Sequence, residues 1–245
     1  MKEHLLPYFD ERESFIGGCG IDMLVFHSTV SEVEKFADEC HQYQVSAHYH
    51  IGLNGQITKL VDEEKRAWHA GKSSWRGFTG SINSRSIGIE IQNKTLGQTS
   101  FPKKQIEDLI PFAKKIIKKY NIKSENIVGH SDIAPERKPD PGYRFPWKEL
   151  SKNGIGLWYH LNQKSKETNI KLLLETIGYN TDNLSAAAYA FCRRFSPEYV
   201  IKDNDIPHLV NNVLPGNFVF MKEEKFLKTL QAVAYSYKRP TFLVP

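Results

Sequence analysis

The feature that most constrains the fold is an alternation of strand-like and helix-like segments between residues 21 and 130. Strand patterns cover Ile21 to Phe26 and Ser86 to Gln92, where apolar residues form a short run or occupy every second position. Amphipathic helical patterns cover 33–40 and 106–120. Strands that alternate with helices favour a sheet covered by helices, so we predict the α/β class with a mixed central β-sheet.

Local signals refine the ends of these segments. Asn54-Gly55 lies between two strand-like runs and predicts a tight hairpin, because both residues tolerate a positive φ. Ser31 followed by Glu34 predicts a capping box at the start of the first helix. Pro111 predicts a kink or an early break in the second helix, since proline lacks the backbone N–H that a helix interior uses.

A change of pattern near residue 150 predicts two domains. Ser151 to Gly156 (SKNGIG) has the composition of a linker. Only helical segments are expected beyond it, over 170–177, 184–195, 206–213 and 223–237. We therefore predict an α/β domain at residues 1–150 and a small all-α domain at residues 151–245.

Composition and charge exclude several classes of protein. The chain of 245 residues is 40% hydrophobic and 25% charged, which rules out collagenous, coiled-coil and wholly disordered chains. Its formal net charge of +5 suits a mildly basic surface that meets an anionic polymer, but it is far short of a nucleic-acid clamp. The three cysteines are too sparse for a disulfide framework or a C-x-x-C metal site.

Membrane and export signals are missing from the sequence. No apolar run is long enough to span a bilayer. Met1 to Phe15 has no apolar core of a secretory signal, and Gly17-Gly18-Cys19 only superficially resembles a lipoprotein cleavage site. The cytoplasm is therefore the default expectation, with envelope association or unconventional export left open.

Histidines supply the candidate chemistry. His27 and His130 each stand where a strand meets a loop, which is where sites in open α/β sheets are built. Asp140 lies between two prolines that stiffen its backbone, and this suits a metal ligand and equally a plain turn. His48 and His50 share one strand face and could also bind a metal, although strand histidines are more often structural. The residue pattern alone leaves these alternatives open.

Four segments, in order along the chain, favour the metal-site alternative. They are VFHST at 25–29, SAHYHI with AWHAG within 46–71, NSRSIGIE at 83–90, and GHSDIAP with KPDPG within 129–142. Together they resemble the zinc-dependent N-acetylmuramoyl-L-alanine amidases of type 2, relatives of the peptidoglycan recognition proteins. Residues 173–195 resemble the small helical peptidoglycan-binding module that often follows this catalytic domain.

The resemblance implies a catalytic metal site. It places one Zn²⁺ per chain on His27, His130 and Asp140, with an open fourth position for water. It also implies that Glu90 moves protons as the general acid/base and that Lys138 stabilises the oxyanion.

Further positions of the family motifs imply a groove for glycan and peptide. The predicted substrate-binding residues are His48, Trp68, His69, Asn83 and Arg85. Arg85 either pairs with a stem-peptide carboxylate or forms a structural ion pair. Some relatives carry a catalytic tyrosine just before the histidine that matches His48, but Ala47 stands there in this chain, which leaves the acid/base role to Glu90.

The function implied is hydrolysis of the amide bond between the lactyl group of N-acetylmuramic acid and L-alanine of the peptidoglycan stem peptide. The missing export signal favours recycling of soluble muropeptides, including those with a 1,6-anhydro sugar, whereas the helical module favours polymeric peptidoglycan. Two alternatives are a lytic phage-type amidase that acts on intact sacculi and a peptidoglycan sensor that binds without cutting. Sensors typically lack a zinc ligand, and all three implied ligands are present here.

Overall fold

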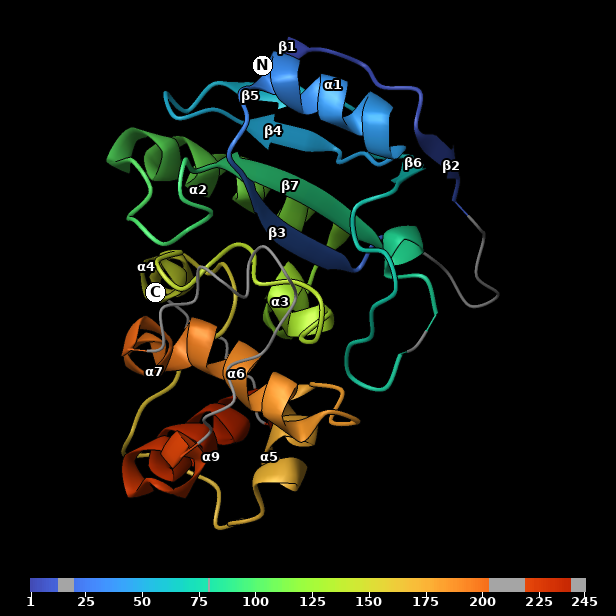
Figure 1. Cartoon of the computed structure of the whole chain (residues 1–245). Helices are drawn as coiled ribbons and strands as arrows, with labels where there is room; N and C mark the ends of the chain where they lie inside the picture. Colours follow the sequence, from blue (N-terminus) through green and yellow to red (C-terminus); the bar gives the residue numbers. More distant parts are fainter. Residues whose placement is uncertain (13–19, 79, 203–218, 239–245) are drawn as a thin grey trace.

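A six-stranded mixed sheet forms the centre of the computed structural model, which describes residues 1–12, 20–78, 80–202 and 219–238 (Figure 1). From one edge to the other the strands are β1 (Lys2–Glu3), β5 (Ile57–Lys59), β4 (Tyr49–Ile51), β7 (Ser86–Gln92), β3 (Met23–Thr29) and β8 (Ile127–Gly129). Only β4 and β5 pair antiparallel in this sheet, while β2 (Phe9–Glu11) and β6 (Lys65–Ala67) form a separate antiparallel pair. The predicted mixed α/β fold is confirmed.

Helices lie on both faces of the sheet. They are α1 (Val33–Tyr43), α2 (Lys103–Tyr120), α3 (His130–Ile133), α4 (Trp147–Lys152), α5 (Ile170–Ile177), α6 (Leu184–Phe195), α7 (Pro197–Lys202) and α9 (Glu224–Lys238). Short 3-10 helices cover Ile82–Arg85, Ser124–Asn126 and Val219–Lys222. The predicted helix at 206–213 lies outside the described residues, as does the Gly17-Gly18-Cys19 segment. Within the described ranges, no helix is both long and apolar enough to cross a bilayer.

The period-2 alternation of the strands separates two faces of the sheet. On one face Phe26 of β3 and Ile89 of β7 pack with Leu109 of α2 in one apolar cluster. On the other face Val25 of β3 packs with the C-terminal helices. Because successive side chains point to opposite faces, His27 of β3 shares the second face with Val25, which is the face covered by the C-terminal helices.

Local predictions had mixed outcomes. The hairpin at Asn54-Gly55 is confirmed, and Gly55 adopts a φ of +83°. The capping box is wrong, because the Ser31 hydroxyl donates to Glu39 and no side chain caps α1. Pro111 does not break α2, since it lies on the exposed side, where water can bond the carbonyl that proline leaves without a partner.

The C-terminal helices share an apolar core with the sheet. Tyr189 and Phe191 of α6 lie in the same buried cluster as Val25 and Val128. The predicted linker at 151–156 is packed as well, because α4 extends to Lys152 and Ile155 is fully buried. The helical region is thus in close contact with the face of the sheet that carries His27, and its status as a separate domain stays a prediction.

Candidate metal centre

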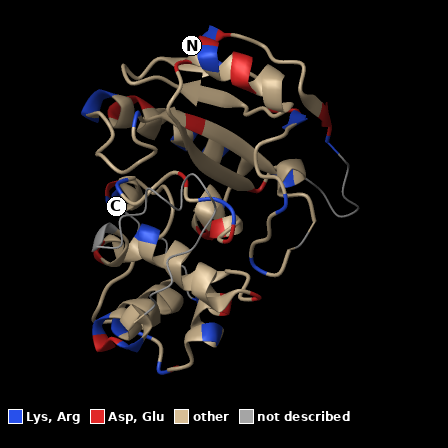
Figure 2. Ribbon diagram, viewed as in Figure 1, with Lys and Arg blue, Asp and Glu red and all other residues tan. Residues whose placement is uncertain are grey.

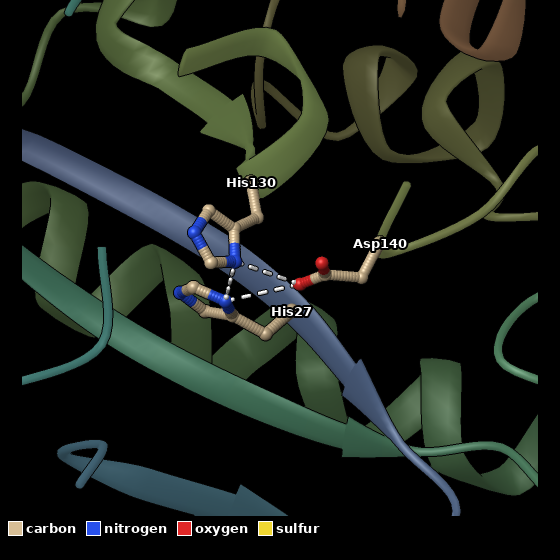
Figure 3. A group of neighbouring side chains, drawn as sticks. All are labelled: His27, His130 and Asp140. Carbon is tan, nitrogen blue, oxygen red and sulfur yellow. Dashed lines mark hydrogen bonds and ion pairs between the residues drawn. The ribbon is translucent and has the colours of Figure 1, made fainter. Parts of the chain in front are cut away.

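Three side chains from separate elements converge on one point (Figure 3). His27 belongs to β3, His130 begins α3 directly after β8, and Asp140 belongs to the loop that follows α3. The two Nδ1 atoms are 3.0 Å apart, and each lies 3.1 Å from Oδ2 of Asp140. This is the arrangement in which three protein ligands surround a metal ion.

A chain of hydrogen bonds fixes the tautomer of His27. The Ser86 hydroxyl donates to the Ile82 carbonyl at 2.7 Å, so its oxygen is free to accept from Nε2–H of His69 at 3.1 Å. Nδ1 of His69 therefore has no proton and accepts from Nε2–H of His27 at 3.0 Å. It follows that Nδ1 of His27 presents its lone pair to His130 and Asp140.

His130 reaches the same state through the backbone. Its Nε2–H donates to the Ala70 carbonyl at 3.1 Å, which leaves the Nδ1 lone pair facing the cluster. Burial lowers the pKa of His27 to about 4, so this ring is neutral and ready to act as a ligand.

This donor set suits a cation. Two lone pairs and a carboxylate oxygen face one another at about 3 Å without a proton between them, which is repulsive unless a positive ion lies among them. Tetrahedral bonds of about 2.0–2.1 Å place neighbouring ligand atoms roughly 3.3 Å apart, close to the observed spacing. The residues therefore fit a small divalent metal ion bound by nitrogen and oxygen.

Glu90 lies beside the three donor atoms. It is the register partner of His27 on the adjacent strand β7, and its Oε1 is 4.0 Å from Nδ1 of His27. Glu90 is the one charged residue of β7, and Figure 2 shows an acidic segment in red on this strand. Burial and the Asp140 carboxylate raise the pKa of Glu90 well above its ordinary value. Its Oε2 is buried without a hydrogen-bond partner among the described residues, as expected of a group that exchanges protons with a ligand.

Lys138 lies two residues before Asp140 in the loop after α3. Its side chain is half-buried, and its positive charge acts on both His27 and Glu90. This places an ammonium group near the cluster, where it can act on a negatively charged oxygen.

His69 and Asn83 lie behind the cluster. The ring of His69 packs against His27 and also lies over Gly88, where a Cβ atom would come within 2.5 Å of it, so only glycine leaves room. Oδ1 of Asn83 accepts from the backbone N–H groups of His69 at 3.2 Å and Ala70 at 2.7 Å. Asn83 thereby positions His69, which bonds His27, and Ala70, whose carbonyl bonds His130.

His48 is fully buried on the same sheet face. Its Nδ1 accepts from the Gly88 N–H at 3.0 Å, and its Nε2 lies 3.1 Å from the Lys65 carbonyl. Burial lowers the pKa of His48 to about 3. His48 thus contacts two backbone groups and the guanidinium of Arg12, whose Nη2 lies 2.9 Å from Nε2, and its side chain has no exposed surface.

Trp68 and Arg85 bond to other partners. The Trp68 indole N–H donates to Asp10 at 2.7 Å. Arg85 forms an ion pair with Asp22, in which Nε donates to Oδ1 at 2.7 Å. For Arg85 this is the structural ion pair, one of the two alternatives that the sequence leaves open.

Ser86 and Ala70 are supporting groups that the sequence analysis missed. For Ser86 the signal is strand parity, because Ser86, Gly88 and Glu90 alternate along β7 and so share the face of the site. For Ala70 there is no side-chain signal, since it acts through its backbone carbonyl.

A shallow pocket continues from the ends of the strands that carry His27 and Glu90. It has a volume of about 480 Å³. Its lining combines apolar, acidic and basic groups: Val30, Ser31, Glu32, Glu34, Lys35, Gln92 and Lys94. Neither the three converging side chains nor Glu90 line this pocket, which lies beyond the ends of β3 and β7.

Comparisons with known proteins find relatives in one enzyme family. Residues 18–143 match the family described as N-acetylmuramoyl-L-alanine amidase. The N-acetylmuramoyl-L-alanine amidase AmiD of Escherichia coli is 44% identical over 152 residues, which are 56% of this chain and 55% of AmiD, so the chain spans about half the length of that relative. The 1,6-anhydro-N-acetylmuramyl-L-alanine amidase AmpD of Enterobacter cloacae is 38% identical over 55% of this chain and 70% of AmpD.

A solved structure extends the likeness to the C-terminal helices. It is the complex of E. coli AmiD with anhydro-N-acetylmuramic acid-L-Ala-D-γ-Glu-L-Lys. The two structures share 30% sequence identity and a TM-score of 0.70, over 95% of this chain and 98% of that one. The similarity therefore covers the sheet and the helical region together.

Proposed function

Because the chain belongs to the N-acetylmuramoyl-L-alanine amidase family, as its sequence motifs predict, we propose that it hydrolyses the amide bond between the lactyl group of N-acetylmuramic acid and L-alanine of the stem peptide. The observation that carries the proposal is the convergence of His27, His130 and Asp140 beside Glu90. This arrangement joins a metal site to a proton carrier, which is what hydrolysis of an amide by water needs.

We propose Zn²⁺ as the metal, one ion per chain, held by His27, His130 and Asp140. Two neutral imidazoles and one carboxylate leave a net charge of about +1 at such a site. When bound, the ion supplies Lewis acidity to a water molecule and to the substrate carbonyl. Three protein ligands leave a fourth position open.

Glu90 is the proposed acid/base. Its carboxylate takes a proton from the attacking water, and its raised pKa allows it to keep that proton until the alanine amine leaves. Lys138 is the proposed cation that stabilises the oxyanion formed on the lactyl carbonyl oxygen. The 4.0 Å distance from Glu90 to His27 and the charge of Lys138, which acts on His27 and Glu90, support these roles.

The proposed substrate is a muropeptide, and the anhydro-muropeptide that the AmiD complex contains is the first candidate. Contacts of His48, Trp68, His69, Asn83 and Arg85 with the substrate stay predictions, as do a role in muropeptide recycling and a cytoplasmic location. Residues 151–245 are the proposed helical, peptidoglycan-binding-like domain.

Digestion of anhydro-muropeptides and intact sacculi side by side, with product mass spectrometry, tests the proposal. An amidase releases intact stem peptides from at least one of the two substrates, and the favoured substrate separates recycling from lysis of the wall. A sensor would bind both without releasing peptide. Protein that contains stoichiometric zinc and cleaves neither substrate would refute the proposed activity.

A further inference from the structure

A charged pair is buried where the C-terminal helices meet the metal centre. Arg194 of α6 donates from Nη1 to Oδ2 of Asp132 on α3 at 2.8 Å, and both side chains are 1% exposed. Arg194 also donates to the Ile127 carbonyl at 3.2 Å, and its guanidinium lies 3.8 Å from the ring centre of Trp147. Because isolated buried charges are costly, such a pair persists only with closely fitted partners. The contact therefore fixes α6 against α3.

A second residue of the C-terminal region reaches the same carboxylate. Tyr179, which follows α5, donates its hydroxyl to Oδ1 of Asp132 at 2.7 Å. Burial raises the pKa of the Tyr179 phenol well above its ordinary value, so the hydroxyl keeps its proton and acts as the donor. Each oxygen of Asp132 is thus held by a different residue of the helical region.

Asp132 in turn holds the backbone that carries two of the three ligands. Its Oδ2 accepts from the N–H of Gly129 at 2.8 Å, directly before His130. Ser131, which lies between His130 and Asp132, donates its N–H to the Asp140 carbonyl at 2.8 Å. A displacement of Asp132 would therefore be passed to both His130 and Asp140.

We propose that Arg194 and Tyr179 are positioning residues for the metal centre, and that the C-terminal helices are a structural part of that centre. The inference rests on the proposed function, because it takes His27, His130 and Asp140 to hold Zn²⁺. Groups that orient metal ligands tune metal affinity, since affinity depends on the geometry of the ligands. The helical region thus acts on the site through Asp132, independently of any contact with peptidoglycan.

Two tyrosines make a matched pair for the test. Tyr237 of α9 is 2% exposed, like Tyr179 a buried phenol of the helical region, but its hydroxyl has no hydrogen-bond partner in the part of the chain that the structure describes. Tyr179→Phe and Tyr237→Phe each remove one buried hydroxyl, and only the first removes a bond to Asp132. The dissociation constant for Zn²⁺ is measured on the full chain by competition with a chromophoric chelator, and the visible absorption of Co²⁺-loaded protein reports the ligand geometry.

We expect Tyr179→Phe to weaken Zn²⁺ binding about 3–10-fold, below the 10–100-fold typical of a group bonded directly to a ligand, and to alter the Co²⁺ spectrum. Tyr237→Phe keeps both properties. Arg194→Lys, which keeps the charge but loses the planar donor fork, is the second variant and is expected to lose more affinity than Tyr179→Phe.

Three results would overturn the inference. One is a Zn²⁺ dissociation constant that stays within about twofold of wild type in both Tyr179→Phe and Arg194→Lys, which is smaller than the expected effect. Another is an equal loss in Tyr237→Phe, which would indicate general loosening of the helical core. If the wild-type chain binds no Zn²⁺ at all, the proposed function fails first and the inference fails with it, so the two failures are distinguishable.

Discussion

His27 and Glu90 are register partners on the parallel strands β3 and β7, and His27 Nδ1 lies 4.0 Å from Glu90 Oε1. The backbone ladder sets this spacing, because both strands bury their opposite face against α2 and a slip by one residue would turn either side chain to the wrong face. The proposed proton carrier is thus held beside a proposed metal ligand by the pairing of two central strands.

Replacement of one ligand should abolish metal binding. We expect wild-type protein to contain about one zinc per chain and His130→Ala to contain little, because the two remaining protein ligands bind the ion too weakly to retain it. Elemental analysis after gel filtration measures the zinc content. His160→Ala, which removes an exposed histidine, is the control and should keep its zinc. Stoichiometric zinc and full turnover in His130→Ala would refute the ligand assignment.

Removal of the proposed acid/base should separate metal binding from turnover. Glu90→Gln keeps the shape of the side chain but cannot carry the proton, so we expect turnover to fall about 10²–10⁴-fold while the zinc content is unchanged. Glu107→Gln, on the exposed side of α2, should have wild-type turnover. A loss below about threefold in Glu90→Gln, far short of that range, would move the acid/base role to another residue.

The hydrogen bonds behind His27 should contribute to metal affinity. His69→Leu removes the acceptor for Nε2–H of His27, so we expect Zn²⁺ to bind about 10–100-fold more weakly. His69→Asn offers an oxygen near the position of Nδ1 and should recover part of that loss. Chelator competition measures both constants. Equal, wild-type affinity in the two variants would show that His69 does not position His27.

Metal-free protein should lose stability as the pH falls below about 6.5, the ordinary value for histidine. Burial, followed by the charge of Arg12, lowers the pKa of His48 to about 3. Between pH 3 and 6.5 the unfolded chain therefore binds a proton at His48 that the folded chain does not, so stability decreases towards acid. His48→Gln should reduce the slope of unfolding free energy against pH by up to about 1.4 kcal/mol per unit in urea titrations. An unchanged slope would contradict the pKa shift.

Strand parity and helical periodicity are the parts of this molecule that the sequence predicts well. The alternation along β7 turns Glu90 to the sheet face away from the buried Ile89 and Ile91. Successive side chains of a strand point to opposite faces regardless of the tertiary contacts. The C-terminal segments at 170–177 and 184–195 agree with α5 and α6 residue for residue. Capping is less predictable, since the Ser31 hydroxyl turns to Glu39, a partner that only the folded helix brings near.

The assembly of the site depends on contacts that no local pattern encodes. His27 and His130 are 103 residues apart in the chain, and only the resemblance to a family joins them to Asp140 before the fold is known. His69 belongs to a family motif and is predicted to contact substrate; its hydrogen bond to His27 and the packing of its ring over Gly88 of β7 appear only in the folded structure. Arg194 and Asp132 likewise meet only through the packing of α6 on α3.

Hydrolysis in H₂¹⁸O is the most direct test of the central claim. Zinc-loaded wild-type protein is incubated with anhydro-N-acetylmuramic acid-L-Ala-D-γ-Glu-L-Lys, and the products are analysed by mass spectrometry. The account predicts two products, in which the lactyl carboxylate of the sugar carries one ¹⁸O and the released tripeptide carries none, because water attacks the lactyl carbonyl. A label in the peptide, a cut at another bond, or an uncleaved substrate would contradict it.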